Sequence, residues 1–274
     1  MSRKTAKALG KLPAKNDVRA LLFARFVGID TAPVVSLPWK GRAAFPARSF
    51  GNRDEGCCTR ASQAVLAMRM ERVEQRRTPK VTDAEVHRVY RAMTERLYGG
   101  GDTGGYETDA LSEWRRPEYT FRDTAGRALT IDAYTRVNHL DLDEVRVALY
   151  VTKARGAKLC LSLPRAFSRI DPPATWDVPE GQPLIGPWEP NSWGGHSLTC
   201  DGYDRDGVWL VHTWYDGGVY RQLLTWRAFA AYCDEFHVVI DSANAWKKRL
   251  RPGVLDVAGI VKAVNKVSSY PVAA

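Results

Sequence analysis

The sequence lacks any apolar run long enough to cross a membrane, and it lacks a secretory signal. A transmembrane helix needs about 20 consecutive apolar residues, and no window of this 274-residue chain approaches that length. The N-terminal residues 1–16 are basic and contain no apolar core of the kind that a signal peptide requires. We therefore expect no membrane contact, and a location in the cytoplasm or in a virion assembled there.

The cysteines lack the spacing of a disulfide framework or of a zinc site. They number five, two of them (Cys57 and Cys58) are adjacent, and no CxxC pair or Cys/His cluster occurs. We expect reduced thiols, no metal and no cofactor.

A nucleic-acid-binding motif is missing as well, although the formal net charge is +9. The basic residues are scattered, with small clusters within 4–15, 69–80 and 247–251, and no recognised motif accompanies them. A basic surface attracts any anionic partner and keeps a protein in solution. Nucleic acid is therefore not the expected partner.

Helical periodicity is present in the first half of the chain. Apolar residues over 58–75 fall mainly on one helical stripe. Thr82 and Glu85 have the spacing of a capping box and predict a helix over 82–97. Two further helices are expected over 109–114 and 143–153.

The second half of the chain has an extended pattern. Strands are expected over 158–163, 196–203, 208–213, 218–224 and 236–241. The proline-rich stretch 171–191 is expected to be a long loop, and the tryptophan-rich stretch 176–193 is expected to form a packed cover rather than a ligand site. Helices followed by strands predict an α+β protein whose two halves are built separately.

We divide the chain into an N-terminal arm (1–48), a helical lobe (49–130), a β lobe (131–245) and a C-terminal tail (246–274). The arm is expected to lie along the surface of the core or to be partly disordered. The tail carries a basic patch and then an apolar-striped helix over 254–267, which could pack on the core or on another subunit.

Cys58 and His196 are the candidate nucleophile and base. A thiol at a helix N-terminus has a lowered pKa, because the helix dipole and free backbone N–H groups favour the thiolate. Cys58 follows a glycine-containing turn and opens the first expected helix. His196 follows Gly194 and Gly195 and begins an apolar strand, a position that exposes the ring at a strand start. A thiol and an imidazole placed in this way suit nucleophilic catalysis.

Two segments around these residues resemble the papain family of cysteine peptidases. The stretch from Asn52 to Cys58 resembles the nucleophile turn, and Asn52 stands where the family has a glutamine that donates to the oxyanion hole. The stretch from Gly195 to Tyr203 resembles the strand that carries the catalytic histidine, here His196. About 140 residues separate this histidine from the cysteine, within the roughly 130–150 typical of papain-type enzymes.

Two further segments, in the expected order, also resemble the family. Gly104, Gly105 and Tyr106 resemble its substrate-lining stretch. The stretch from residue 208 to Trp214 resembles the strand on which the family places an asparagine and a shielding tryptophan, and His212 occupies the asparagine position. Gly195 and Trp214 are expected to border the substrate with the glycine pair.

The resemblance implies a two-lobed papain-like fold and a thiol peptidase or amidase acting on a polypeptide or peptide-like substrate. Cys58 would attack a carbonyl, His196 would transfer the proton, and the Cys58 backbone N–H with Asn52 would stabilise the oxyanion. His212 would orient His196 by accepting a hydrogen bond from its ring. More particularly, the chain resembles compact members encoded by bacteria and their phages, and residues 1–50 look too short and too unhelical for the long inhibitory prodomain of secreted members.

The departures from the family pattern fall around the reaction centre. Besides His212, Thr59 replaces a bulky aromatic residue and Glu55 replaces a structural cysteine. This leaves a second hypothesis, in which the chain is a papain-like scaffold with a structural or binding role, such as a component of a phage particle. Protein partners could then bind through the N-terminal arm and the C-terminal tail.

Overall fold

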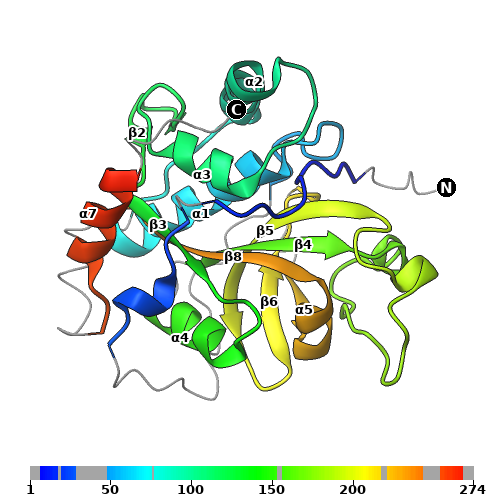
Figure 1. Ribbon diagram of the computed structural model, residues 1–274. Helices are drawn as coiled ribbons and strands as arrows, with labels where there is room; N and C mark the ends of the chain where they lie inside the picture. The colour runs from blue at the N-terminus through cyan, green and yellow to red at the C-terminus, as the bar shows by residue number, and fades with distance from the viewer. Residues whose placement is uncertain are drawn as a thin grey trace.

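The computed structural model describes residues 7–17, 20–28, 48–75, 77–152, 156–216, 221–242 and 254–267. Figure 1 shows a helical part on one side of the molecule and a large sheet on the other, with the N-terminal segment running between them. The predicted α+β class is confirmed. Within the described ranges, no helix is both long and apolar enough to cross a bilayer.

The helical lobe is built from α1 (Cys58–Gln75), α2 (Asp83–Tyr98) and α3 (Glu107–Trp114). Thr82 caps α2, because its side chain accepts a hydrogen bond from the Glu85 backbone N–H at 3.2 Å, as the capping-box spacing predicts. The α3 helix begins two residues before its predicted start. A short hairpin follows, formed by β1 (Phe121–Arg122) and β2 (Ala128–Leu129).

The β lobe contains a six-stranded antiparallel sheet with the strand order β3-β8-β4-β5-β6-β7. The strands are β3 (Ala133–Val137), β4 (Ala157–Leu163), β5 (Gly194–Tyr203), β6 (Gly207–Val211), β7 (Arg221–Thr225) and β8 (Cys233–Ile240). On β5, His196 lies opposite Leu161 of β4. The candidate base is thus the third residue of β5 and is held there by pairing with β4.

Helices and short turns complete the β lobe. They are α4 (Leu142–Thr152), α5 (Trp226–Tyr232), α7 (Val257–Val267) and the 3-10 turns η1 (Phe23–Phe26), η3 (Arg165–Phe167) and η4 (Gly186–Trp188). Strand β3 and helix α5 were not predicted. The apolar stripe of α7 packs on this chain's own core, the first of the two alternatives for the tail, whereas the basic patch at 247–251 lies outside the described residues.

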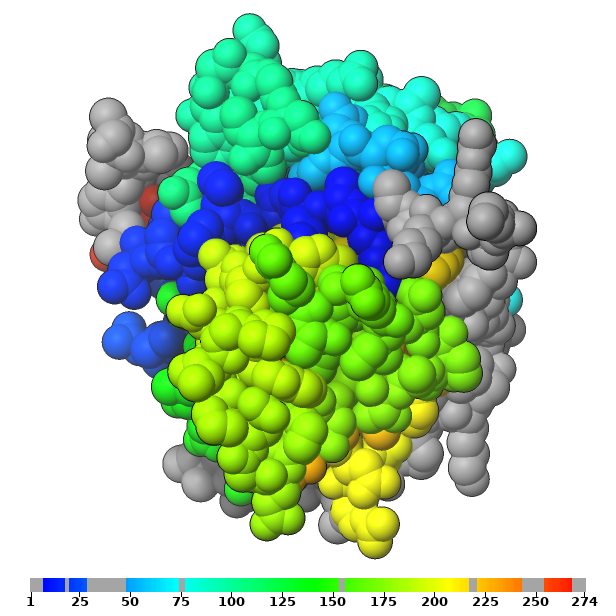
Figure 2. Space-filling model, turned by 90° about the vertical axis from the view of Figure 1, so that its right-hand side faces the viewer, coloured from blue at the N-terminus to red at the C-terminus, as the bar shows by residue number. Residues whose placement is uncertain are grey.

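The N-terminal segment lies between the two lobes. The described N-terminal residues, drawn in dark blue, run along the boundary of the helical and β lobes (Figure 2), and Lys11 among them is only 4% exposed. The segment follows the surface of the core, and it is seated in the groove between the two lobes. We call residues 7–15 the groove segment, and we call the space that they occupy the interlobe groove.

Candidate active site

The turn that leads into Cys58 is fixed to the helical lobe. The Gly56 backbone N–H donates to the Asp102 carboxylate at 2.9 Å. The Glu55 carboxylate binds the His87 ring of α2. Glu55 thus ties the turn to α2 through the contact of its carboxylate with the His87 ring. These bonds hold the N-terminus of α1 in place, with the candidate nucleophile as its first residue.

Asn52, the expected oxyanion donor, bridges the two lobes instead. Its Nδ2 donates to the Thr213 hydroxyl at 2.9 Å and to the Thr213 carbonyl at 3.4 Å. Its Oδ1 is buried and has no hydrogen-bond partner within the described ranges. In this state the amide of Asn52 is therefore engaged by the β lobe, and a role at an oxyanion would require this bond to change.

The Cys58 thiol is fully buried beneath the groove segment. Burial raises its pKa to about 11, against the opposing effects of the Ser197 and Gly10 backbone N–H groups and of the Lys158 charge. The thiol is therefore protonated at neutral pH in this state. Gly10 approaches the sulfur through its backbone N–H, which can donate a hydrogen bond to a thiolate. An N–H is not an electrophile, so the sulfur has no group to attack at this contact.

His196 is held by stacking and makes no side-chain hydrogen bond. Its ring lies on that of Trp214, with 3.9 Å between centroids and 16° between planes. Neither ring nitrogen has a partner within the described part of the chain, so the imidazole is not bonded to the Cys58 thiol here. Burial, with the nearby His212 and Lys158, lowers the pKa of His196 well below its usual value. The imidazole is therefore neutral.

His212 is fixed by Gln222, a residue that the sequence analysis missed. The Gln222 amide N–H donates to the Ala174 carbonyl, so its oxygen faces His212 and accepts from Nε2 at 2.7 Å. Burial lowers the pKa of His212 to about 3, which keeps the ring neutral. Its Nδ1 then carries a lone pair, and this atom has no partner among the described residues. The predicted bond from His196 is therefore not made in this state, although an acceptor for it is present.

A buried lysine, also missed from the sequence, lies under the nucleophile helix. The Lys158 ammonium contacts the Ser62 hydroxyl of α1, the Ser197 hydroxyl at 2.7 Å and Glu107 at 3.4 Å. It favours the thiolate form of Cys58. The signal in the sequence was a lysine within an otherwise apolar strand.

The groove segment is hydrogen-bonded to both walls of the interlobe groove through its backbone. On the helical side, Gly105 N–H donates to the Gly10 carbonyl at 2.7 Å, and Leu12 N–H donates to the Gly105 carbonyl at 3.0 Å. On the β side, Lys11 N–H donates to the Gly195 carbonyl at 3.2 Å. The segment is thus bound as an extended peptide.

The other residues predicted to line the substrate site contact the same segment. A Cβ atom on Gly104 would come within 2.1 Å of the segment's backbone, so only glycine allows this approach. The Trp214 indole N–H donates to the Ala8 carbonyl at 3.1 Å. The Lys15 ammonium lies 4.2 Å from the Tyr106 ring centroid. All five predicted lining positions therefore contact residues 8–15.

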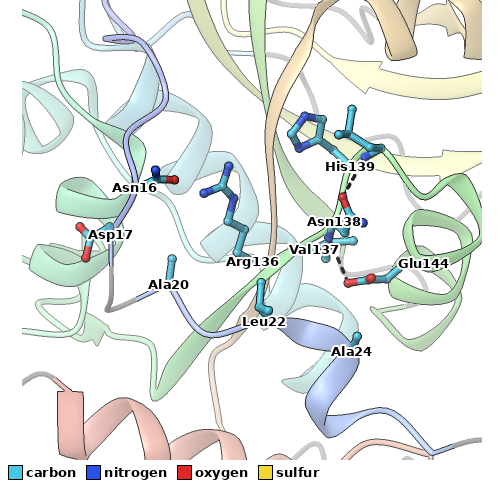
Figure 3. A pocket seen from close by; sticks show the side chains of 11 residues that line it. Asn16, Asp17, Ala20, Leu22, Ala24, Arg136, Val137, Asn138, His139 and Glu144 are labelled. Carbon is cyan, nitrogen blue, oxygen red and sulfur yellow. Dashed lines mark hydrogen bonds between the residues drawn. The ribbon is translucent and has the colours of Figure 1, made fainter.

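A separate open pocket lies beside the continuation of the groove segment (Figure 3). In it, Glu144 accepts a hydrogen bond from the Asn138 backbone N–H at 3.0 Å. Its lining residues are Asn16, Asp17, Ala20, Leu22, Ala24, Arg136, Val137, Asn138, His139, Leu140 and Glu144. None of them is a predicted site residue, because the groove that holds those is filled by residues 8–12. The described ranges also contain no cluster of three or more His, Cys, Asp or Glu side chains suited to a metal ion.

No protein-family model and no curated protein sequence matches this chain. Solved structures do. Xylellain, a cysteine protease from Xylella fastidiosa, aligns with a TM-score of 0.61 at 16% identity over 88% of this chain and 99% of that chain. The Carica candamarcensis cysteine protease CMS1MS2, in complex with E-64, gives 0.55 at 14% identity over 76% and 99%. Procathepsin B from Trypanosoma congolense gives 0.55 at 13% identity over 86% and 87%. The chain therefore has the papain-like cysteine protease fold.

Proposed function

We propose that this protein is a thiol peptidase or related amidase, with Cys58 as nucleophile and His196 as base, and that the groove segment holds it in an occluded state. One observation carries the proposal: an extended peptide, residues 8–12, is bound backbone to backbone across the N-terminus of the cysteine helix. A groove that binds one extended peptide in this way can bind another when the segment leaves.

The reaction would start when the groove segment is displaced. Water or substrate then replaces Gly10 above Cys58, so the burial that now raises the thiol pKa and lowers the imidazole pKa is reduced. His196 takes the thiol proton and the thiolate attacks the substrate carbonyl carbon. The tetrahedral intermediate collapses as the imidazolium protonates the leaving amine, and water hydrolyses the remaining thioester.

His212 is suited to orient His196 during these steps. It is neutral, and its Nε2–H is held by Gln222, so the free lone pair is on Nδ1. A ring N–H of His196 could donate to that atom. This fixes the tautomer of His196 so that the other nitrogen is free to accept the thiol proton.

The test uses a variant that opens the groove. A Cβ atom at residue 10 would lie 1.6 Å from the Gly56 carbonyl oxygen, so Gly10→Ala should expel the segment without touching Cys58 or His196. We expect Gly10→Ala to hydrolyse members of a peptide library that wild type cleaves slowly. Adding Cys58→Ala should abolish this hydrolysis. Ala14→Ser, an exposed change in the same segment, serves as the control.

A scaffold function is the second candidate, and the filled groove favours it. A protein that uses only its surface has no need for an accessible thiol, and here the thiol is covered by its own chain. In that case a folded Gly10→Ala variant with an accessible Cys58 would cleave no peptide. Cys58→Ala would then leave assembly or partner binding unchanged, as for a structural component of a phage particle.

A further inference from the structure

The Lys11 side chain leaves the groove segment and enters an acidic pocket in the β lobe. Its ammonium lies 2.6 Å from Asp234 Oδ2 and 3.3 Å from Glu235 Oε1, and the side chain is fully buried. The Ser162 hydroxyl donates to the same Asp234 oxygen at 2.9 Å. We call these three residues, Asp234, Glu235 and Ser162, the acidic pocket.

The acidic pocket needs a cation. Two neighbouring carboxylates, one buried and one partly buried, repel each other and lose hydration, and a bound cation offsets that cost while both stay ionised. Burial raises the pKa of Glu235 to about 7, and Lys11 acts in the opposite direction. When the groove segment leaves, Lys11 leaves with it. The emptied pocket then favours a substrate that brings its own positive charge.

The acidic pocket also has hydrogen-bond capacity that Lys11 does not use. Asp234 Oδ1 and Glu235 Oε2 are buried and have no hydrogen-bond partner in the described ranges. An ammonium has three N–H donors and a guanidinium has five. Lysine and arginine side chains both carry the positive charge that the pocket requires. Arginine has more N–H donors and can therefore bond to more of the carboxylate oxygens of Asp234 and Glu235.

The pocket is close to the reacting centre. Lys11 follows Gly10, whose N–H reaches the Cys58 sulfur, and Lys11 N–H is bonded to Gly195, next to His196 in the chain. In a bound peptide, the residue whose side chain enters the acidic pocket is therefore the direct neighbour of the residue that contacts the Cys58 thiol.

We propose that the acidic pocket is a specificity subsite that takes a lysine or arginine side chain of the substrate, and that Lys11 occupies it in the occluded state. This inference rests on the proposed function for its use in hydrolysis, although binding tests it independently. The competing interpretation is that Asp234 and Glu235 only anchor Lys11.

The first measurement is hydrolysis by Gly10→Ala/Lys11→Ala, in which both the groove and the pocket are vacated. Fluorogenic peptides are compared in pairs that differ only in charge, lysine against norleucine and arginine against citrulline, at each position near the scissile bond. We expect kcat/KM to favour the basic member by about 30-fold or more at one position. Asp234→Asn with Glu235→Gln should bring this ratio close to one, whereas Asp206→Asn, on a distant exposed turn, should not change it.

The second measurement is binding, which needs no catalysis. Cys58→Ala is added to Gly10→Ala/Lys11→Ala, and labelled peptides that copy residues 7–15 are titrated with either lysine or norleucine at the position of Lys11. We expect tighter binding of the lysine peptide by a similar factor, lost in Asp234→Asn with Glu235→Gln. If Lys11→Ala lowers the melting temperature too far for the assay, Lys11→Met is used in its place, because methionine keeps the volume of the aliphatic part of the lysine side chain.

The outcomes separate the two proposals. Hydrolysis without any preference for a basic residue would overturn the subsite proposal and leave the peptidase proposal intact. This holds even if the peptide that copies residues 7–15 binds better with lysine, because such binding would show only that the pocket anchors Lys11. Preferential binding of the lysine peptide with no hydrolysis of any peptide would overturn the peptidase and support the pocket as a site for basic side chains. Equal binding and equal hydrolysis of the paired peptides would overturn the subsite.

Discussion

The two walls of the interlobe groove differ in how their polar groups are paired. On the helical wall, the turn before Cys58 is bonded on several sides, with Gly56 held by Asp102 and Glu55 held by His87. On the β wall, both ring nitrogens of His196 and the Nδ1 of His212 are buried without a hydrogen-bond partner in the described residues. The turn that carries Cys58 is thus fixed on the helical wall, although Asn52 Oδ1 also lacks a partner in the described residues, whereas the imidazoles of the β wall themselves retain unused hydrogen-bonding capacity.

This difference indicates which wall is set up to change during a reaction. An unpaired buried polar atom costs about 1–3 kcal/mol, and such atoms in a native structure call for an explanation, for example a catalytic role. The groove segment does not satisfy them, because its backbone bonds go to Gly105, Gly195 and Trp214. The helical wall thus fixes the position of the thiol before any reaction. The two imidazoles of the β wall are neutral, and their unpaired nitrogens can still bind a proton or a hydrogen-bond partner.

The largest expected effect comes from removing the unpaired imidazole. In the Gly10→Ala background, His196→Ala should lower kcat/KM for peptide hydrolysis by about 10³-fold or more, because the thiol then has no base. The same substitution should lower the melting temperature only slightly. It removes the stacking of the imidazole on Trp214, but it breaks no side-chain hydrogen bond.

His87→Gln is the matched control for that experiment. It changes a histidine of the helical wall whose partner is Glu55, so it should affect stability more than turnover. The opposite pattern, with His87→Gln inactive and His196→Ala fully active, would remove His196 from the reaction.

The second effect concerns access to the thiol. Gly10→Ala should raise the rate at which iodoacetamide alkylates Cys58 by about 10- to 100-fold at pH 7, because the displaced segment no longer buries the sulfur. Peptide mapping by mass spectrometry should find Cys58 modified ahead of Cys57, which lies in the core of the helical lobe with its thiol near the Phe50 carbonyl. An unchanged rate, or Cys57 modified first, would contradict this picture of the groove.

The third effect tests the second imidazole of the β wall. His212→Asn should keep or improve turnover, since the amide oxygen accepts a hydrogen bond without titrating. His212→Leu should lower turnover by about tenfold, because His196 loses its acceptor. Gln222→Leu should have an intermediate effect, since it removes the bond that fixes the His212 tautomer. If His212→Leu and His212→Asn both match the parent, His212 serves only in packing.

Much of the helical wall was predictable from the sequence. The capping-box spacing at Thr82 and Glu85 predicted the start of α2, and the residue at the end of the nucleophile turn, Cys58, does open α1. These are local signals, because a cap and a helical stripe involve residues only three or four positions apart. The order of the motifs then predicted the fold, which the solved structures bear out.

The contacts that decide the state of the site were not predictable in this way. Residues 8–12 have no periodicity, and their partners, Gly105 and Gly195, lie about 95 and 185 residues further along the chain. No local pattern around Asp234 and Glu235 indicates that Lys11, more than 220 residues earlier in the chain, binds them. Long-range pairing of an irregular segment leaves no local pattern, so only the folded chain reveals it.

The smallest expected effect is a pH dependence of the groove segment. Burial raises the pKa of Glu235 to about 7 while Lys11 is bound, and Lys11 opposes that rise. Removing the Lys11 charge by itself raises this pKa further, so binding of the Lys11 ammonium releases a proton from Glu235. The contribution of Glu235 to holding the segment is therefore present above the pKa of the open state and is lost as pH falls through 7.

Hydrogen exchange measures this contribution. The charged and titratable groups that face Glu235 are Lys11, Asp234, Glu107, Cys160, Cys233 and His237. After correction for intrinsic exchange, protection of the Lys11 and Leu12 amides should fall by about threefold to tenfold between pH 8 and pH 6, since one proton is linked to release. Glu235→Gln removes the titrating group and should flatten this dependence, whereas Glu180→Gln, on an exposed loop, should leave it as in wild type. Protection that rises towards pH 6, or a slope that survives Glu235→Gln, would mean that another group controls the segment and that the acidic pocket is not its pH-sensitive anchor.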